Sequence, residues 1–159
     1  MKVWIRADGN EQIGTGHVMR CLAIAEALEA AGVQVCFVMA DDAATKLVKS
    51  RDKKVRILHT RYDRMEEELP VLTAVMEEEH PDMLLIDSYY VSDAYLQQLT
   101  EQVWTVYIDD KSFRSYPVNM IINYNIYGTE ACIIRSRLTV SWEQLMHPSD
   151  RNFAMWNIL

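Results

Sequence analysis

Residues 5–22 read IRADGNEQIGTGHVMRCL, and the rest of the chain is organised around this stretch. A short apolar strand runs into a polar loop with three glycines, Gly9, Gly14 and Gly16, which leads to His17 at the expected start of a helix. Glycine adopts backbone conformations closed to other residues and lets a ligand approach the main chain. A helix N-terminus adds free amides and a partial positive charge, which favour an anionic or strongly polar ligand. We therefore interpret the loop as a binding loop.

The segments that flank the loop predict a strand, a helix and a second strand. Apolar residues recur at helical spacing after His17, and Gly32 is typical of a helix end. Residues 33–39 then form a second, mostly apolar run. Two strands joined by a crossover helix should be parallel.

The same alternation continues to about residue 123. The expected elements are a helix over 42–50, a strand over 55–58, a helix over 62–79, a strand over 83–87, a helix capped by Ser92, and strands over 104–108 and 120–123. We expect Pro70 to break or restart its helix, and the glutamates at 66–68 and 77–79 to be solvated. Apolar strands that alternate with helices predict a doubly wound α/β domain with a mainly parallel, Rossmann-like sheet.

Polar side chains gather where the predicted strands end. In doubly wound sheets, ligands bind beyond the carboxyl ends of the strands, so Asp8, Asp87, Tyr89 and Asp109 should share this rim. Strand-end carboxylates also bond to loop amides, and that purely structural interpretation stays open here.

His17 reaches the same rim from the glycine loop. A helix N-terminus disfavours the positively charged imidazolium, so we expect the neutral form, which a general base requires. A structural histidine that bonds to its neighbours is the alternative interpretation.

Two familiar nucleotide-binding patterns are absent from the loop. No Gly-Lys-Ser/Thr follows it, and Met19 stands where a dinucleotide fingerprint needs its third glycine. An acid near the end of the second predicted strand, Asp41 or Asp42, keeps ribose binding open. No group of His, Cys or carboxylate residues has metal-ligand spacing, and we expect neither a metal nor a cofactor.

Charge and cysteine content restrict the partners and the compartment. The net charge is -7, and residues 111–159 hold five Lys or Arg against three Asp or Glu, which leaves -9 for residues 1–110. So acidic a surface argues against nucleic acid or an anionic membrane as partner. The three cysteines are widely spaced and fit free thiols in a reducing compartment. With no long apolar run and no leader, the sequence predicts a cytoplasmic protein.

Four segments together resemble a known enzyme family. They are IRADGNEQIGTGHVMRCLAIAEAL at 5–28, IDSYY at 86–90, YIDD at 107–110 and INYNIY at 122–127. They are similar to the UDP-2,4-diacetamido-2,4,6-trideoxy-β-L-altropyranose hydrolases of pseudaminic acid biosynthesis and to related spore-coat polysaccharide proteins. More distantly, the chain resembles the acceptor-binding half of the peptidoglycan N-acetylglucosaminyltransferase, which shares the two-domain GT-B fold. The resemblance therefore implies the N-terminal domain of a GT-B fold.

The resemblance also implies an activity and a set of site residues. The reaction would be metal-independent hydrolysis at the anomeric carbon of a UDP-linked diacetamido sugar, with release of UDP. His17 would be the base for the attacking water, and Tyr89 would be the second active-site residue. The residues that we expect to bind the substrate are Asp8, Gly9, Gly14, Thr15, Gly16, Arg20, Asp87 and Asp109.

The resemblance covers residues 1–127, which we expect to be one GT-B-like domain. Residues 128–159 would be a divergent tail and not a separate domain, and the family's C-terminal nucleotide-binding domain would be absent. We therefore expect little or no activity from the chain alone, and a separately encoded C-terminal domain or a homodimer as partner. A non-catalytic remnant or sugar-binding module, and the acceptor domain of an inverting GT-B glycosyltransferase, are the alternatives.

Overall fold

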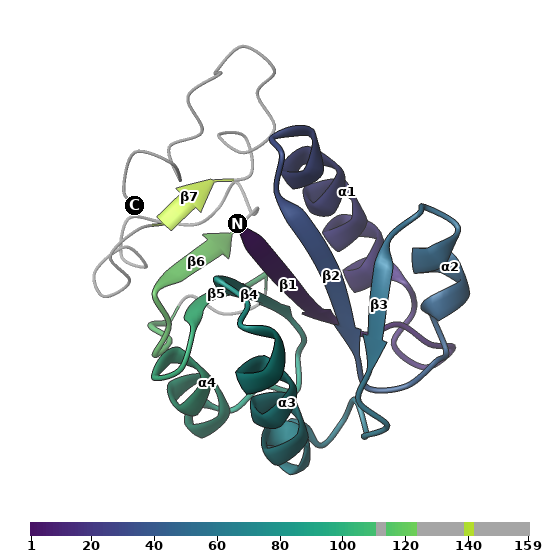
Figure 1. Cartoon of the computed structure of the whole chain (residues 1–159). Coiled ribbons are helices and arrows are strands. Elements are labelled where there is room, and N and C mark those ends of the chain that lie inside the picture. The colour runs from purple at the N-terminus through teal and green to yellow at the C-terminus, as the bar shows by residue number, and fades with distance from the viewer. Residues whose placement is uncertain (111–113, 124–138, 142–159) are drawn as a thin grey trace.

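Strands and helices alternate along the chain in the computed structural model, which describes residues 1–110, 114–123 and 139–141. In chain order the elements are β1 (Lys2–Ala7), α1 (Gly16–Ala30), β2 (Gln34–Met39), α2 (Thr45–Lys49), β3 (Lys54–Ile57), α3 (Met65–Glu79), β4 (Met83–Asp87), α4 (Asp93–Thr100), β5 (Trp104–Ile108), β6 (Met120–Asn123) and β7 (Thr139–Ser141). The strands form one sheet in the order β3-β2-β1-β4-β5-β6-β7, and every neighbouring pair is parallel (Figure 1). The predicted doubly wound α/β fold is confirmed.

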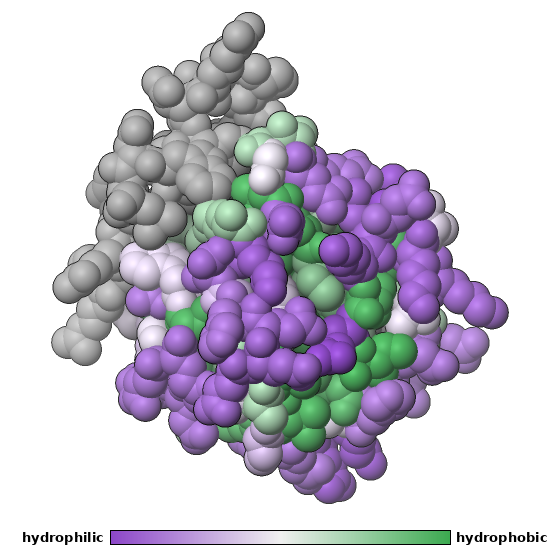
Figure 2. Space-filling model, in the orientation of Figure 1, coloured by the Kyte–Doolittle hydropathy of each residue, from purple (hydrophilic) through white to green (hydrophobic). Residues whose placement is uncertain are grey.

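Helices cover both faces of the sheet because side chains alternate along its strands. Val3, Ile5 and Ala7 of β1 pack on the side of α1 and α2, while Trp4 lies among the side chains of α3 and α4. Each face thus has its own apolar core, as continuous apolar strands require. On the face drawn in Figure 2, hydrophilic side chains predominate among the described residues, with hydrophobic groups between them.

The ends of the helices follow local sequence signals. The Ser92 side chain accepts a hydrogen bond from the Tyr95 N–H at 3.1 Å, so Ser92 is the N-cap of α4 as predicted. Helix α1 ends at Ala30, and Gly32 follows with a φ of 84°. That left-handed conformation is readily adopted by glycine.

Helix α3 differs from the prediction, because it runs through Pro70 without a break. Proline inside a helix removes one backbone hydrogen bond and costs about 3 kcal/mol. Burial of Met65, Leu72 and Met76 against the sheet offsets that cost. Tertiary packing thus outweighs a local helix-breaking signal.

Strand β7 was not expected from the sequence. It lies in the 128–159 segment and pairs with β6, with Ile122 opposite Val140. The remainder of that segment lies outside the described residues. None of the described helices is both long and apolar enough to cross a membrane.

The centre of the sheet sets the position of the site. Strand β1 pairs with β2 on one side and β4 on the other, and Ala7 lies opposite Asp87. The chain leaves β1 and β4 toward opposite sides of the sheet, so the loops that follow these strands diverge and form a crevice between them. His17 and Asp87 lie there.

Candidate functional site

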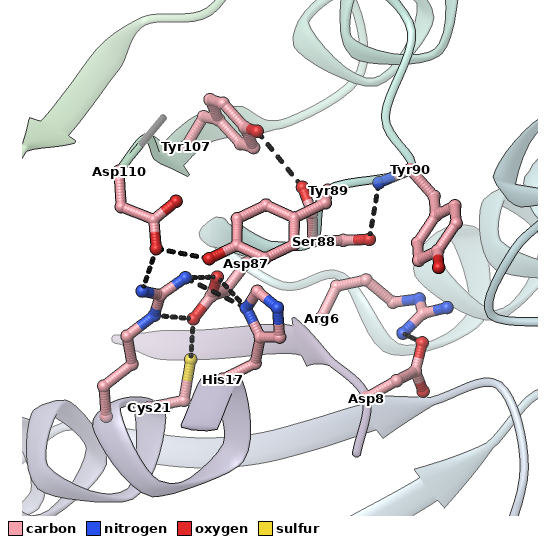
Figure 3. A network of polar contacts seen from close by, with 11 residues as sticks. Arg6, Asp8, His17, Cys21, Asp87, Ser88, Tyr89, Tyr90, Tyr107 and Asp110 are labelled. Carbon is pink, nitrogen blue, oxygen red and sulfur yellow. Dashed lines mark hydrogen bonds and ion pairs between the residues drawn. The ribbon is translucent and has the colours of Figure 1, made fainter. Parts of the chain in front are cut away.

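The centre of the site is a contact between His17 and Asp87 (Figure 3). Nδ1 of His17, in the first turn of α1, lies 2.6 Å from Oδ1 of Asp87, the last residue of β4, and both side chains are buried. Nη2 of Arg20 also lies 2.9 Å from Nδ1, but this guanidinium nitrogen donates to Asp87 as well. Because a carboxylate can only accept, we assign the Nδ1 proton to the contact with Asp87. Nε2 then carries a lone pair and makes no hydrogen bond within the described part of the chain. The histidine is therefore oriented as a proton acceptor.

Nε2 points away from Asp87 and toward the side on which Asp8 and Tyr90 lie (Figure 3). A narrow pocket occupies this position. Its lining residues are Asp8, Ile13, His17, Tyr62, Asp87, Ser88, Tyr89 and Tyr90. The pocket is too narrow in this conformation to admit a water molecule, so its side chains must move apart before a hydroxyl group can donate to Nε2.

Arg20 holds the carboxylates around His17. From the next turn of α1 it donates to both oxygens of Asp87 through Nε and Nη2, and Nη1 lies 2.7 Å from Oδ2 of Asp110. Charge-assisted bonds of this kind are about twice as strong as neutral ones. Arg20 therefore ties α1 to the ends of β4 and β5 and neutralises Asp87. Its predicted part in substrate binding stays a prediction.

Tyr89 closes the cluster on the solvent side. Its hydroxyl donates to Oδ2 of Asp110 at 2.5 Å, and its ring meets that of His17 edge to face, with centroids 4.5 Å apart. Partial burial, followed by the hydrogen bond to Asp110, raises the pKa of Tyr89. Tyr89 is therefore a neutral phenol at ordinary pH. It packs against the imidazole and is 42 % exposed, and its predicted catalytic role stays a prediction.

Cys21 contacts the same carboxylate from one turn further along α1. Its Sγ lies 3.5 Å from Oδ2 of Asp87 and is fully buried. Burial and then the charge of Asp87 raise the pKa of this thiol well above its usual value. Because the thiolate is the reactive form, burial and the raised pKa make Cys21 a weak nucleophile.

A second buried network lies behind Asp8. The Arg6 Nε and Nη2 donate to the two carboxylate oxygens of Glu68 at 2.7 Å each, and Nη1 lies 2.5 Å from Oδ2 of Asp8. Tyr95 donates to Oε1 of Glu68 at 2.7 Å. Oδ1 of Asp8 accepts from the Ala40 N–H at 2.8 Å, so its carboxylate is held from two sides.

This network corrects the expectation that Glu68 is solvated. Glu68 and Arg6 are both fully buried. Burial alone would lower the pKa of Arg6, but the charges of Asp8 and Glu68 more than offset that effect and raise it. An arginine within an apolar strand was the sequence signal that a buried acid must lie nearby.

The buried phenol of this network gives the protein a specific response to alkaline pH. Burial, followed by the charge of Glu68, raises the pKa of Tyr95 well above its ordinary value of about 10. Above pH 10 the unfolded chain loses this proton and the folded chain keeps it, so the stabilisation present below pH 10 is lost as the pH rises. We expect Tyr95→Phe to be less stable than the wild type at pH 8 by about 1 kcal/mol.

That deficit should shrink by about 1 kcal/mol at pH 11. Urea unfolding at both pH values measures it. A deficit that stays constant between pH 8 and 11 would show that the phenol titrates alike in both states.

The three loop glycines have different surroundings. A Cβ on Gly9 would lie 3.1 Å from the Gly14 carbonyl and from a methyl of Val18, and Gly14 itself has a φ of +72°. The protein's own packing and backbone therefore require both glycines. A Cβ on Gly16 would meet nothing within 4 Å, so the fold alone does not require glycine there.

An open groove of about 780 Å³ borders this loop on the side of α2. Its lining residues are Gly9, Asn10, Glu11, Gln12, Thr15, Ala43, Ala44, Lys46 and Leu47. The Thr15 side chain, at the N-cap of α1, makes no capping hydrogen bond. Ligand binding by the loop remains a prediction.

Alanine at Gly16 and at Gly14 should have opposite effects on stability. Gly16→Ala removes backbone freedom from the unfolded chain, so we expect stabilisation by about 0.5 kcal/mol. Gly14→Ala places a side chain at a positive φ and should destabilise by about 1 kcal/mol or more. Chemical denaturation of both variants gives the two values. Destabilisation by Gly16→Ala would mean that the fold does require glycine at this position.

The structure brings four predicted site residues into direct contact: His17, Arg20, Asp87 and Tyr89. Asp109 is buried at the end of β5, and its backbone N–H bonds to the Ile122 carbonyl. No group of three or more metal-ligating side chains occurs among residues 1–110, 114–123 and 139–141.

Comparison with known proteins shows similarity of fold. No protein-family model matches this sequence, and no curated protein matches it. The MurG structure from Acinetobacter baumannii aligns with a TM-score of 0.60 and 13% identity over 80% of this chain and 42% of that one. The spinosyn rhamnosyltransferase SpnG, complexed with spinosyn aglycone, gives 0.59 and 12% identity over 78% and 45%. The glycosyltransferase VinC, in complex with dTDP, gives 0.51 and 14% identity over 68% and 34%.

This chain therefore spans less than half the length of each of these three structures. At identities this low the alignments establish the fold alone. The all-parallel sheet and the helices on both faces match one half of these proteins. The domain thus has the Rossmann-like fold of the N-terminal half of a GT-B glycosyltransferase.

Proposed function

We propose that this chain supplies the base-bearing half of a GT-B-type enzyme that acts on a nucleotide-linked sugar. The observation that carries the proposal is the 2.6 Å contact between Nδ1 of His17 and Asp87, which leaves Nε2 as an acceptor beside a pocket. A positioned base of this kind contributes a factor of about 10² to 10⁴ to a rate.

The proposed reaction is a displacement at the anomeric carbon. A hydroxyl nucleophile in the pocket gives its proton to Nε2 of His17 as its oxygen bonds to that carbon. The bond from the carbon to the diphosphate breaks at the same time, and the nucleoside diphosphate leaves with the electron pair. Asp87 holds the imidazole in the required tautomer and stabilises the imidazolium that forms.

The identity of the hydroxyl separates two versions of this function. With water, the chain is the N-terminal half of a hydrolase, and the family resemblance points to a UDP-linked 2,4-diacetamido-2,4,6-trideoxy sugar in pseudaminic acid or other surface polysaccharide biosynthesis. With the hydroxyl of an acceptor, it is the acceptor domain of an inverting glycosyltransferase. The matched structures favour the second version, because VinC is a glycosyltransferase and SpnG a rhamnosyltransferase. His17 has the same role in both.

A sugar-binding module without catalysis is the third version. The residues around His17 would then serve only to hold the ligand. We place the main nucleotide contacts outside the described residues, on a second α/β half or a second copy of the chain. We also propose that residues 1–127 form one domain and that residues 128–159 are a tail to it.

Calorimetry and an assay of UDP release test the proposal together. The wild type and His17→Asn are titrated with UDP and with the free diacetamido sugar. Each is then combined with the nucleotide-binding half and given the UDP-linked sugar with and without a hydroxyl acceptor. We expect both proteins to bind the sugar and only the wild type to release UDP. Release without an acceptor identifies the hydrolase. Equal release by both proteins, or sugar binding without any release, would overturn the catalytic role.

A further inference from the structure

Exposed aromatic side chains are concentrated at the mouth of the His17 pocket. Among the described residues, Tyr89 and Tyr90 are the large aromatic side chains classed as exposed, at 42 % and 41 %. Tyr62, which is partly exposed, lines the same pocket. By contrast, Tyr95 and Tyr107 are buried in the core. Since exposed apolar groups that cluster mark interaction sites, this group requires an explanation.

Tyr62 and Tyr90 are held in place before any ligand binds. Their rings pack edge to face with centroids 5.4 Å apart and an interplanar angle of 82°. The Tyr62 hydroxyl donates to the side chain of Gln12, which belongs to the glycine loop. The backbone N–H of Tyr90 donates to Oγ of Ser88 at 3.2 Å. A pair fixed in this way loses little conformational freedom on binding.

Polar as well as aromatic side chains line the pocket. Asp8, His17 and Ser88 line it together with the two tyrosines, and Figure 3 shows Tyr90 on the side of His17 away from Asp110. A pyranose ring has the matching character, with C–H groups on one face and hydroxyl or amide groups at its edges. Two nearly perpendicular rings cannot sandwich a planar base, but one exposed face can stack on a sugar.

We propose that Tyr62 and Tyr90 form a platform for the apolar face of the reacting pyranose. The ring rests on the Tyr90 face, Tyr62 fixes the angle of that face, and the polar edge of the sugar turns toward Asp8 and His17. This inference rests on the proposed function, because it assigns a substrate surface beside the proposed base. The platform requires C–H groups on the part of the sugar that meets the Tyr90 ring.

Nuclear magnetic resonance titrations test the platform without requiring turnover. The probes are methyl N-acetyl-β-D-glucosaminide and, separately, UMP. We expect Tyr90→Leu to raise the Kd of the glucosaminide about tenfold and Tyr90→Phe, which keeps the ring, to leave it within twofold. UMP binding should be the same in all three proteins. Because residue 90 is exposed, each variant should retain the thermal unfolding midpoint of the wild type.

Three results would overturn the platform. They are absence of glucosaminide binding to the wild type, equal affinities of Tyr90→Leu and the wild type for the glucosaminide, and an equal loss of UMP binding in Tyr90→Leu. The His17→Asn protein separates this inference from the proposed function. Loss of UDP release in that variant with no platform effect leaves the function standing and the platform refuted. Unchanged UDP release in His17→Asn, together with a clear effect of Tyr90→Leu on glucosaminide binding, would refute the proposed function and leave the platform standing.

Discussion

In the enzyme completed by its nucleotide-binding half, replacement of His17 by asparagine is expected to lower the rate of UDP release from the UDP-linked diacetamido sugar by about 10²- to 10⁴-fold. The imidazole bonds to Asp87 through Nδ1 and leaves Nε2 for the nucleophile. Asparagine can still bond to Asp87, but its amide has no comparable proton acceptor at the position of Nε2. The attacking hydroxyl would then have to lose its proton to solvent.

Binding should survive this substitution, because the sugar platform is built from other residues. The expected result is therefore a fall in kcat with a nearly unchanged KM. Coupled detection of UDP measures both constants. A calorimetric titration with the free sugar gives the affinity of each protein for the sugar independently.

His59→Asn is a matched control for the same chemical change. His59 is exposed and has a φ of 59°, a backbone conformation that asparagine tolerates well. We expect full activity from this variant. An equal loss in both variants would indicate a general effect on the fold, and full activity in His17→Asn would remove His17 from the mechanism.

Replacement of Glu68 by glutamine is expected to lower the free energy of unfolding by about 3 kcal/mol. Glu68 and Arg6 are both completely buried and share two hydrogen bonds of 2.7 Å. The amide removes the charge that compensates the arginine and turns one acceptor into a donor facing another donor. Asp8 remains to balance Arg6, so the loss falls at the lower end of the range for broken buried pairs.

Glu66→Gln, two residues away on the same helix, is the control. Its side chain is exposed, and a surface substitution of this kind changes stability by less than about 0.5 kcal/mol. Guanidinium unfolding of both variants and the wild type gives the comparison. Equal stability of the two variants would mean that the Arg6 pair is not a major term in folding.

The Glu68→Gln substitution should also affect the candidate site. Arg6 holds Oδ2 of Asp8, and Asp8 lines the pocket beside Nε2 of His17. Loss of Glu68 leaves the guanidinium free to shift, and the carboxylate of Asp8 can move with it. We therefore expect a weaker affinity for the sugar in Glu68→Gln even where the protein is fully folded.

The order of elements follows directly from local sequence patterns. The apolar run over 83–87 is long enough for a buried strand, and its observed bounds are the same. Ser92 begins the next helix because its hydroxyl satisfies a free amide of the first turn. These signals act within a few residues, so they can be recognised without knowledge of the fold.

Contacts between distant segments could not be predicted in this way. The pattern around residue 68 indicates a solvated acid, and only the packing of α3 against β1 places Glu68 beside Arg6. The ends of β4 and β5 each offer acids, and the fold brings Asp87 and Asp110 to the same arginine. Pro70 is a helix-breaking signal that burial overrides.

The sequence by itself determined the alternation of strands and helices, the parallel sheet and the delivery of His17 to its rim, because hydrophobic periodicity and turn residues act locally. The tertiary structure decided which carboxylate orients His17, which carboxylates pair with Arg6, and that the ring of Tyr62 packs against that of Tyr90. Such pairings depend on strand order and on helix packing over the sheet, and both are set by the burial of apolar surface across the whole domain.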